Sequence, residues 1–152
     1  ATILHCSHTG SIERVICSLL EKTAKDDGKA PMLPTWLSPS QVRLLPISDA
    51  HLEFADELAD KIAAANIRVD IDNSSDRVGK KIRTASKEWI PYILVIGDKE
   101  LESKTFSVTV RETGEKVDMT AEELIAEVSA KNEGKPFRRL PLPRYTADRI
   151  KF

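Results

Sequence analysis

Apolar residues recur every three or four positions between residues 12 and 20, which is the period of an amphipathic helix. The apolar residues Ile3 and Leu4 before this helix predict the end of a strand, so residues 1–25 are expected to form a strand end and a helix. Residues 26–41 are rich in Asp, Gly and Pro, and the prolines favour an extended, aperiodic linker. The apolar start also suggests that the chain was cut from a longer one.

From residue 42 the pattern alternates between strand and helix periods. Strands are expected over 42–47, 67–71 and 92–96, and the last is a continuous apolar run typical of a buried central strand. Helices are expected between them, one capped by Asp49 and one, strongly basic, that starts after the polar turn at 73–76.

After residue 100 the pattern predicts a β-hairpin and a final helix. Apolar and polar residues alternate over 106–110, and 116–119 pairs back across a Thr-Gly turn. Thr120 and Glu123 have the spacing of a capping box, which starts the helix. This order of elements predicts an α/β layer structure with a mixed sheet.

Charge is distributed unevenly, although the net charge is only −1. Residues 77–87 hold basic residues and no acid, with a local charge of +5, and residues 131–152 also carry +5. Such a split favours a polyanionic partner at one face, which the balanced total conceals. Val78, Ile82 and Trp89 are expected to face the core, which would leave the basic side of their helix exposed. A solvated helix face and a disordered tail are the plain alternative.

Several kinds of site and location are disfavoured. The apolar runs are too short to span a membrane and no signal peptide is recognisable, so a reducing, cytoplasmic compartment is expected. Cys6 and Cys17 cannot build a disulfide framework and are expected to be small buried side chains. His5 and His8 are too few for a metal site by themselves. A flavodoxin-like small-ligand domain would need a glycine-rich phosphate loop, which residues 46–50 do not provide.

The first part of the chain resembles class II aminoacyl-tRNA synthetases. Residues 10–14 read Gly-Ser-Ile-Glu-Arg, which is similar to motif 3 of that family, and the resemblance implies that Arg14 contacts the γ-phosphate of ATP. The residues before it are similar to the threonyl members, in which a histidine nine residues before that arginine is a ligand of the catalytic zinc. The resemblance assigns this role to His5.

The rest of the chain resembles the anticodon-binding domain shared by threonyl, prolyl, histidyl and glycyl synthetases. The resemblance implies a five-stranded mixed sheet flanked by three helices that reads the anticodon of tRNA(Thr). Gly-Asp-Lys-Glu at 97–100 favours the threonyl member, and residues 138–144 are similar to the C-terminus of archaeal-type threonyl enzymes. The matching stretches are 42–47, 67–70, 77–83 and 91–100.

The resemblance also implies where RNA binds. Glu100 aligns with a glutamate that contacts an anticodon base, and a carboxylate suits base donors because it cannot bind phosphate. Ser75 stands where bacterial relatives carry an asparagine, and Thr109 where they carry a base-contacting arginine. Asn73 or Arg111 could therefore share the readout. Basic side chains of the helix would track the RNA backbone, and the candidates are Arg77, Lys80, Lys81 and Arg83.

The domains expected are the end of a catalytic domain (1–25), a linker (26–41), the anticodon-binding domain (42–134) and a basic, irregular tail (135–152). The resemblance implies a parent threonine–tRNA ligase, a homodimer that uses ATP, Mg²⁺ and Zn²⁺. This chain lacks motifs 1 and 2 and the other zinc ligands. It is expected to need no cofactor and to catalyse nothing alone. Its expected partners are the anticodon loop of tRNA(Thr) and the rest of the synthetase, with no membrane.

A stand-alone homologue of the same fold, acting as an accessory or interaction subunit, is the alternative. The motif 3 remnant argues against it, because an accessory module has no need of that motif.

Overall fold

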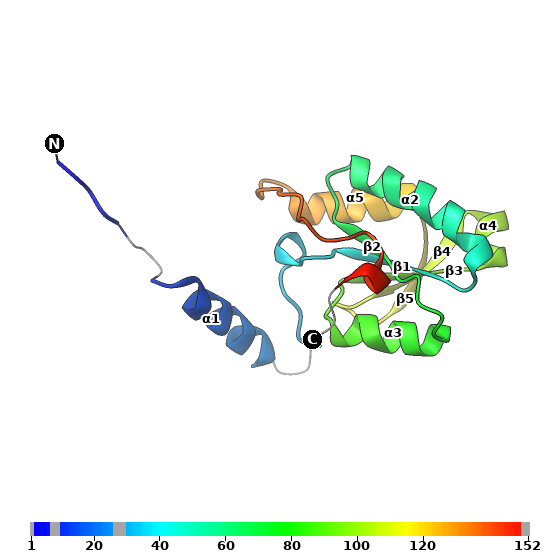
Figure 1. Cartoon of the computed structure of the whole chain (residues 1–152), viewed down its shortest axis with the longest axis horizontal. Helices are drawn as coiled ribbons and strands as arrows, with labels where there is room; N and C mark the ends of the chain where they lie inside the picture. The colour runs from blue at the N-terminus through cyan, green and yellow to red at the C-terminus, as the bar shows by residue number, and fades with distance from the viewer. Residues whose placement is uncertain (1, 7–9, 26–29, 150–152) are drawn as a thin grey trace.

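A five-stranded sheet with helices on both faces forms the body of the protein, and one helix stands apart from it (Figure 1). The computed structural model describes residues 2–6, 10–25 and 30–149. His8, the start of the expected linker (26–29) and the end of the expected tail (150–152) lie outside the described residues.

The sheet has the strand order β2-β1-β3-β4-β5. β1 is parallel to both β2 and β3, whereas β3, β4 and β5 pair antiparallel. The mixed sheet is therefore confirmed, and the apolar run at 92–96 is its middle strand. The bounds are Val42–Pro46 (β1), Val69–Ile71 (β2), Tyr92–Ile96 (β3), Thr105–Val110 (β4) and Lys116–Thr120 (β5).

Helices cover the sheet unequally. α2 and α5 pack on one face and α3 on the other, while the short α4 follows β3 (Figure 1). The expected three flanking helices are present, and α4 is an addition that the sequence pattern did not predict. The bounds are Ile12–Ala24 (α1), Leu52–Ala64 (α2), Val78–Lys87 (α3), Asp98–Ser103 (α4) and Ala121–Asn132 (α5).

Alternation along the strands divides the apolar side chains between two cores. Leu94 and Ile96 of β3 join the larger core under α2 and α5, whereas Ile93 joins Leu45 and Ala85 under α3. The residues of β3 are all apolar because helices cover both faces of this strand.

The helix starts agree with the sequence in one case and differ in another. The Thr120 Oγ1 accepts the Glu123 N–H at 3.3 Å, and the Glu123 carboxylate accepts the Thr120 N–H at 2.7 Å, which confirms the capping box of α5. Asp49 is not the N-cap of α2, because a 3₁₀ turn over Asp49–His51 precedes the first residue, Leu52.

α1 forms where the apolar period predicts a helix, but none of its residues is buried. Ile3 and Leu4 are exposed and no strand forms over the described residues 2–6, because no neighbouring strand lies there to pair with them. Cys6 and Cys17 are also exposed, so their expected burial is wrong. None of the helices in the described part of the chain has the length and apolar character needed to cross a bilayer.

The C-terminal tail is irregular apart from a 3₁₀ turn over Thr146–Asp148, and it is held against the body. The Ile71 N–H donates to the Arg144 carbonyl at 2.9 Å, and Ile71 and Tyr145 form a parallel bridge at the free edge of β2. Arg144 forms ion pairs with Asp56 and Asp60 of α2. The tail as far as residue 149 therefore covers a sheet edge that would otherwise leave backbone groups unpaired.

Candidate nucleic-acid interface

The three parallel strands end at one edge of the sheet, and the segments that follow them carry most of the expected RNA-binding residues. In open α/β sheets, ligands bind outside the carboxyl ends of the strands, where successive connections leave in opposite directions. The connection from β1 to β2 passes through α2 on one face, and the connection from β2 to β3 passes through α3 on the other (Figure 1). We call this carboxyl edge of β2, β1 and β3 the reading edge.

A hollow of about 270 Å³ opens at the reading edge, between the turns that follow β1 and β2. Asn73 and Ser75 both line it, together with Ser48 from the turn after β1. Ser75 is exposed, whereas Asn73 is half-buried and its Oδ1 accepts the Ala147 N–H from the tail at 3.2 Å. The structure therefore brings Asn73 and Ser75 together in a polar hollow.

Glu100 lies in the first turn of α4, immediately after β3. Its Oε2 accepts the Gly97 N–H at 3.0 Å, so the carboxylate caps the helix to which it belongs. An added Cβ at Gly97 would lie 2.6 Å from Cδ1 of Ile47, so the tip of that half-exposed side chain would have to move to make room for it. The half-buried carboxylate is thus held at the reading edge in one orientation.

His51 and Asp98 brace this edge, and the sequence analysis singled out neither His51 nor a contact between the two side chains. The His51 Nδ1 accepts the Ser48 N–H at 3.3 Å, which makes Nε2 the donor to Asp98 Oδ1 at 2.9 Å. This bond joins the turn after β1 to the start of α4. Asp98 comes two residues after β3 and His51 five residues after β1, and this spacing does not reveal that the two strands are neighbours.

Most of the basic side chains of α3 are exposed, as the charge pattern predicts. Arg77, Arg83 and Lys87 are exposed, and so is Lys80, whose ammonium is paired with Asp76 at 2.9 Å. Because α3 starts at the reading edge, these charges continue the polar surface formed by the turns.

Lys81 is an exception, and its expected exposure is wrong. Only 4% of this residue is exposed, and its Nζ donates to the carbonyl oxygens of Pro46 and Asp72, each at 3.0 Å. Pro46 is the last residue of β1, and Asp72 directly follows the last residue of β2. Lys81 therefore ties the two strand ends to α3, and its buried ammonium is not exposed to contact phosphate.

Arg111 and Thr109 are not brought to the reading edge. Arg111 lies at the opposite end of β3, and its guanidinium donates to the carbonyls of Pro31 at 2.9 Å and Ser86 at 2.7 Å. Burial lowers the pKa of this guanidinium. Thr109 lies opposite Ile93 within the sheet and is half-buried. Arg111 thus anchors the linker, which corrects its expected role as a base reader.

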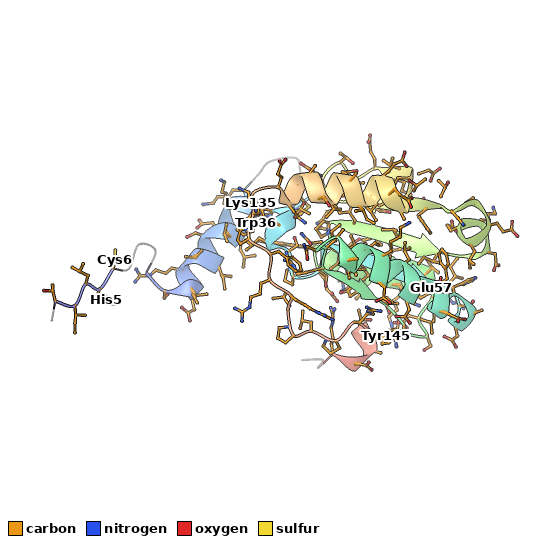
Figure 2. All side chains as sticks on the ribbon, turned by 90° about the horizontal axis from the view of Figure 1, so that it is seen from above. His5, Cys6, Trp36, Glu57, Lys135 and Tyr145 are labelled. Atoms are coloured by element: carbon orange, nitrogen blue, oxygen red, sulfur yellow. The ribbon has the colours of Figure 1, made fainter. Side chains whose placement is uncertain are left out.

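Arg14 and His5 lie far from the reading edge. Arg14 is exposed on α1, and His5 is exposed in the segment before it (Figure 2). Within the described residues, no three His, Cys, Asp or Glu side chains are placed to hold a metal ion. A single imidazole does not make a zinc site, so the residues present here do not fit that metal by themselves.

The profile of a family described as "Anticodon binding domain" matches residues 41–131 of the chain. The chain belongs to this family. The resemblance drawn from residues 42–100 is thus confirmed, and the matched region contains the whole sheet and the reading edge.

Among curated relatives, the threonine–tRNA ligases of Methanobrevibacter smithii and Pyrococcus horikoshii are 66% and 52% identical to this chain. Each alignment covers 99% of the chain, and the chain spans about a quarter of the length of these relatives (25% and 24%). The resemblance to archaeal-type threonyl enzymes is confirmed.

Solved structures agree on the fold. The RNA binding domain of threonyl-tRNA synthetase from Cryptosporidium parvum Iowa II is 30% identical, with a TM-score of 0.61 over 76% of this chain and 27% of that chain. Histidyl-tRNA synthetase from Nostoc sp. PCC 7120 is 22% identical, with a TM-score of 0.59 over 78% of this chain and 27% of that one. The second likeness supports the fold alone.

The adjacent lysines of this anticodon-binding domain should differ in their effect on stability. We expect Lys81→Ala to lower the free energy of unfolding by about 2–3 kcal/mol, because two buried carbonyls lose their donor. Lys80→Ala should change it by less than about 0.5 kcal/mol, since its ion pair is exposed. Urea unfolding measures both, and Lys81→Met, which keeps most of the aliphatic stem, separates lost packing from the lost ammonium. Equal values for Lys80→Ala and Lys81→Ala would contradict the structural role of Lys81.

Proposed function

We propose that this chain is the anticodon-reading part of a threonine–tRNA ligase and binds the anticodon loop of tRNA(Thr). The observation that carries the proposal is membership of the anticodon-binding domain family, together with relatives called threonine–tRNA ligase that align over 99% of the chain. The polar reading edge beside an exposed basic helix supports it, because single-stranded loops are recognised at base edges while cations follow the backbone.

Different side chains would take the two tasks. Glu100, Ser75 and Asn73 offer oxygen or amide groups to base edges. When its carboxylate is ionised, Glu100 accepts hydrogen bonds and donates none. Arg77, Lys80 and Arg83 would contact phosphates, a contact that gives affinity without sequence preference. Thr109 is too short and too far inside the sheet to supply the readout of the arginine it replaces.

The remaining proposals concern the parent enzyme. There Arg14 would contact the γ-phosphate of ATP, and His5 would be one ligand of zinc, with the other ligands outside this chain. ATP, Mg²⁺ and Zn²⁺ would supply amino-acid activation in a homodimeric parent. This chain, with only Arg14 and His5 from that machinery, would bind tRNA and not catalyse.

Titration of the chain with a tRNA(Thr) transcript at two salt concentrations tests the proposal. The same transcript with its second and third anticodon bases exchanged is the matched control. We expect the cognate loop to bind tighter by about 1–3 kcal/mol per base. Salt-dependent binding that ignores the anticodon would overturn base reading and favour the accessory-subunit function.

A further inference from the structure

The tail builds a second basic groove, away from the reading edge. A cavity of about 410 Å³ lies between the tail, α2 and the residues that precede β1 and β2. Arg68 lies directly before β2, so the groove opens at the opposite end of this strand from Asn73. Its basic lining residues are Arg68, Arg139, Arg144 and Arg149.

The wall of the groove is fixed in place. Arg144 is held by Asp56 and Asp60, and Tyr145 donates a hydrogen bond to Asp56. Arg149 pairs with Asp70 at 2.8 Å. Figure 2 shows Tyr145 beside the last turn of the tail, with Lys135 at the tail's beginning. The groove is therefore preorganised, and a ligand would not have to order the tail in order to bind.

Two of the four arginines keep uncompensated charge. Arg144 and Arg149 have carboxylate partners, whereas Arg68 donates only to the carbonyls of Ser38 and Trp36 within the described part of the chain. Arg139 is exposed and no carboxylate within the described ranges pairs with it. Burial lowers the pKa of Arg68, which shows that its surroundings disfavour the charge; an anion in the groove would offset this.

The groove continues past an aromatic side chain into a second basic hollow. Arg68 and Phe137 line both hollows, and the Arg68 guanidinium lies 5.9 Å from the centre of the Phe137 ring. The second hollow adds Lys135, whose ammonium lies 5.9 Å from the centre of the Trp36 ring (Figure 2). Cations spaced along an elongated, partly aromatic surface suit a linear polyanion better than a single small anion.

We propose that this groove, with Arg68 and Arg139 as its anion-binding residues, binds the sugar-phosphate backbone of RNA outside the anticodon bases. The proposal rests on the proposed function for its partner. The tail connects the two surfaces, because Ala147 donates to Asn73 at the reading edge while the preceding residues form the groove. An RNA strand read at that edge can therefore continue along the β2 side of the sheet.

A pair of neighbouring arginines provides a matched test. Arg139 lines the groove and Arg138 does not, yet both are exposed and each loses one charge when changed to Gln. Binding of the full chain to the tRNA(Thr) transcript is measured over a series of salt concentrations. Arg139→Gln should weaken binding about three- to tenfold at low salt, since a charge-assisted contact is lost. The slope of log K against log salt should become shallower by about 0.7–0.9.

The other variants and transcripts decide the interpretation. Arg138→Gln should change affinity less than twofold, and Arg139→Lys should recover most of the slope because it keeps a point charge. The Arg139→Gln loss should be the same for cognate and anticodon-exchanged transcripts.

Equal effects of Arg138→Gln and Arg139→Gln, or no effect of either, would overturn the groove even where anticodon discrimination persists. Binding that depends on Arg139 but ignores the anticodon would retain the groove and overturn base reading. No tRNA binding by the unaltered chain would overturn both.

Discussion

Asp70→Ala is expected to lower the free energy of unfolding by about 3–5 kcal/mol, the usual cost of removing one partner from a buried ion pair. Arg43 and Asp70 are each 1% exposed, and two nitrogens of the guanidinium donate to the two carboxylate oxygens at 2.8 Å. Ser40 and Arg149 also contact this carboxylate. Burial alone would lower the pKa of Arg43, but hydrogen bonds and charges from Asp70 and Glu88 outweigh it and raise the pKa.

Glu88 provides the control for this prediction. Its carboxylate also pairs with Arg43, at 2.7 Å, but its side chain is 49% exposed. Glu88→Ala should therefore cost no more than about 1 kcal/mol, because Arg43 keeps both hydrogen bonds to Asp70 and the lost carboxylate was half exposed. The double variant Arg43→Met/Asp70→Leu should recover much of the Asp70→Ala loss, since no buried charge remains. Urea unfolding measures all three, and a loss for Glu88→Ala as large as that for Asp70→Ala would contradict the argument.

Glu100→Gln should reduce discrimination between cognate and exchanged anticodons by about 1–3 kcal/mol, or roughly 5- to 150-fold, for the base that it contacts. The substitution is chosen because the amide oxygen can still accept the Gly97 N–H that caps α4. The amide nitrogen then replaces the other carboxylate oxygen, and a donor faces the donors of the base. Binding to the exchanged transcript should change little.

The matched control is Glu102→Gln, which removes the same charge from an exposed position on the same helix. It should leave discrimination unchanged, and unfolding curves of the two variants should agree within about 0.5 kcal/mol. If Glu100→Gln weakens cognate and exchanged transcripts equally, Glu100 contributes to affinity only and is not a base reader.

The periodic elements were predictable because their signals are local. The helix over 12–24, the hairpin and the capping box at Thr120 each depend on residues within a few positions of one another. The middle strand was recognisable because both of its faces are apolar, which requires cover on both sides of the sheet. α4 was missed because a six-residue helix is too short to show an apolar period.

The candidate site was predictable only in part. Residue type and the family resemblance pointed to Glu100, Ser75 and Asn73, which do lie at the reading edge. The same reasoning took Lys81 as a phosphate contact and Arg111 as a residue that could share base readout, because charged side chains are ordinarily exposed. Both instead donate to carbonyls of segments distant in sequence, as far as 80 residues away for Arg111 and Pro31.

By itself, the sequence determined the order of the five strands and of the helices that flank the sheet, the basic character of α3 and the family to which the chain belongs, because periodicity, composition and motif spacing are properties of neighbouring residues. The tertiary structure decided which cations are available to an anion and which are consumed inside the protein. It placed Arg149 on Asp70 and left Arg139 beside an open groove, although both belong to the same basic tail. That difference depends on where carboxylates and carbonyls meet after folding, and no local pattern in the chain records it.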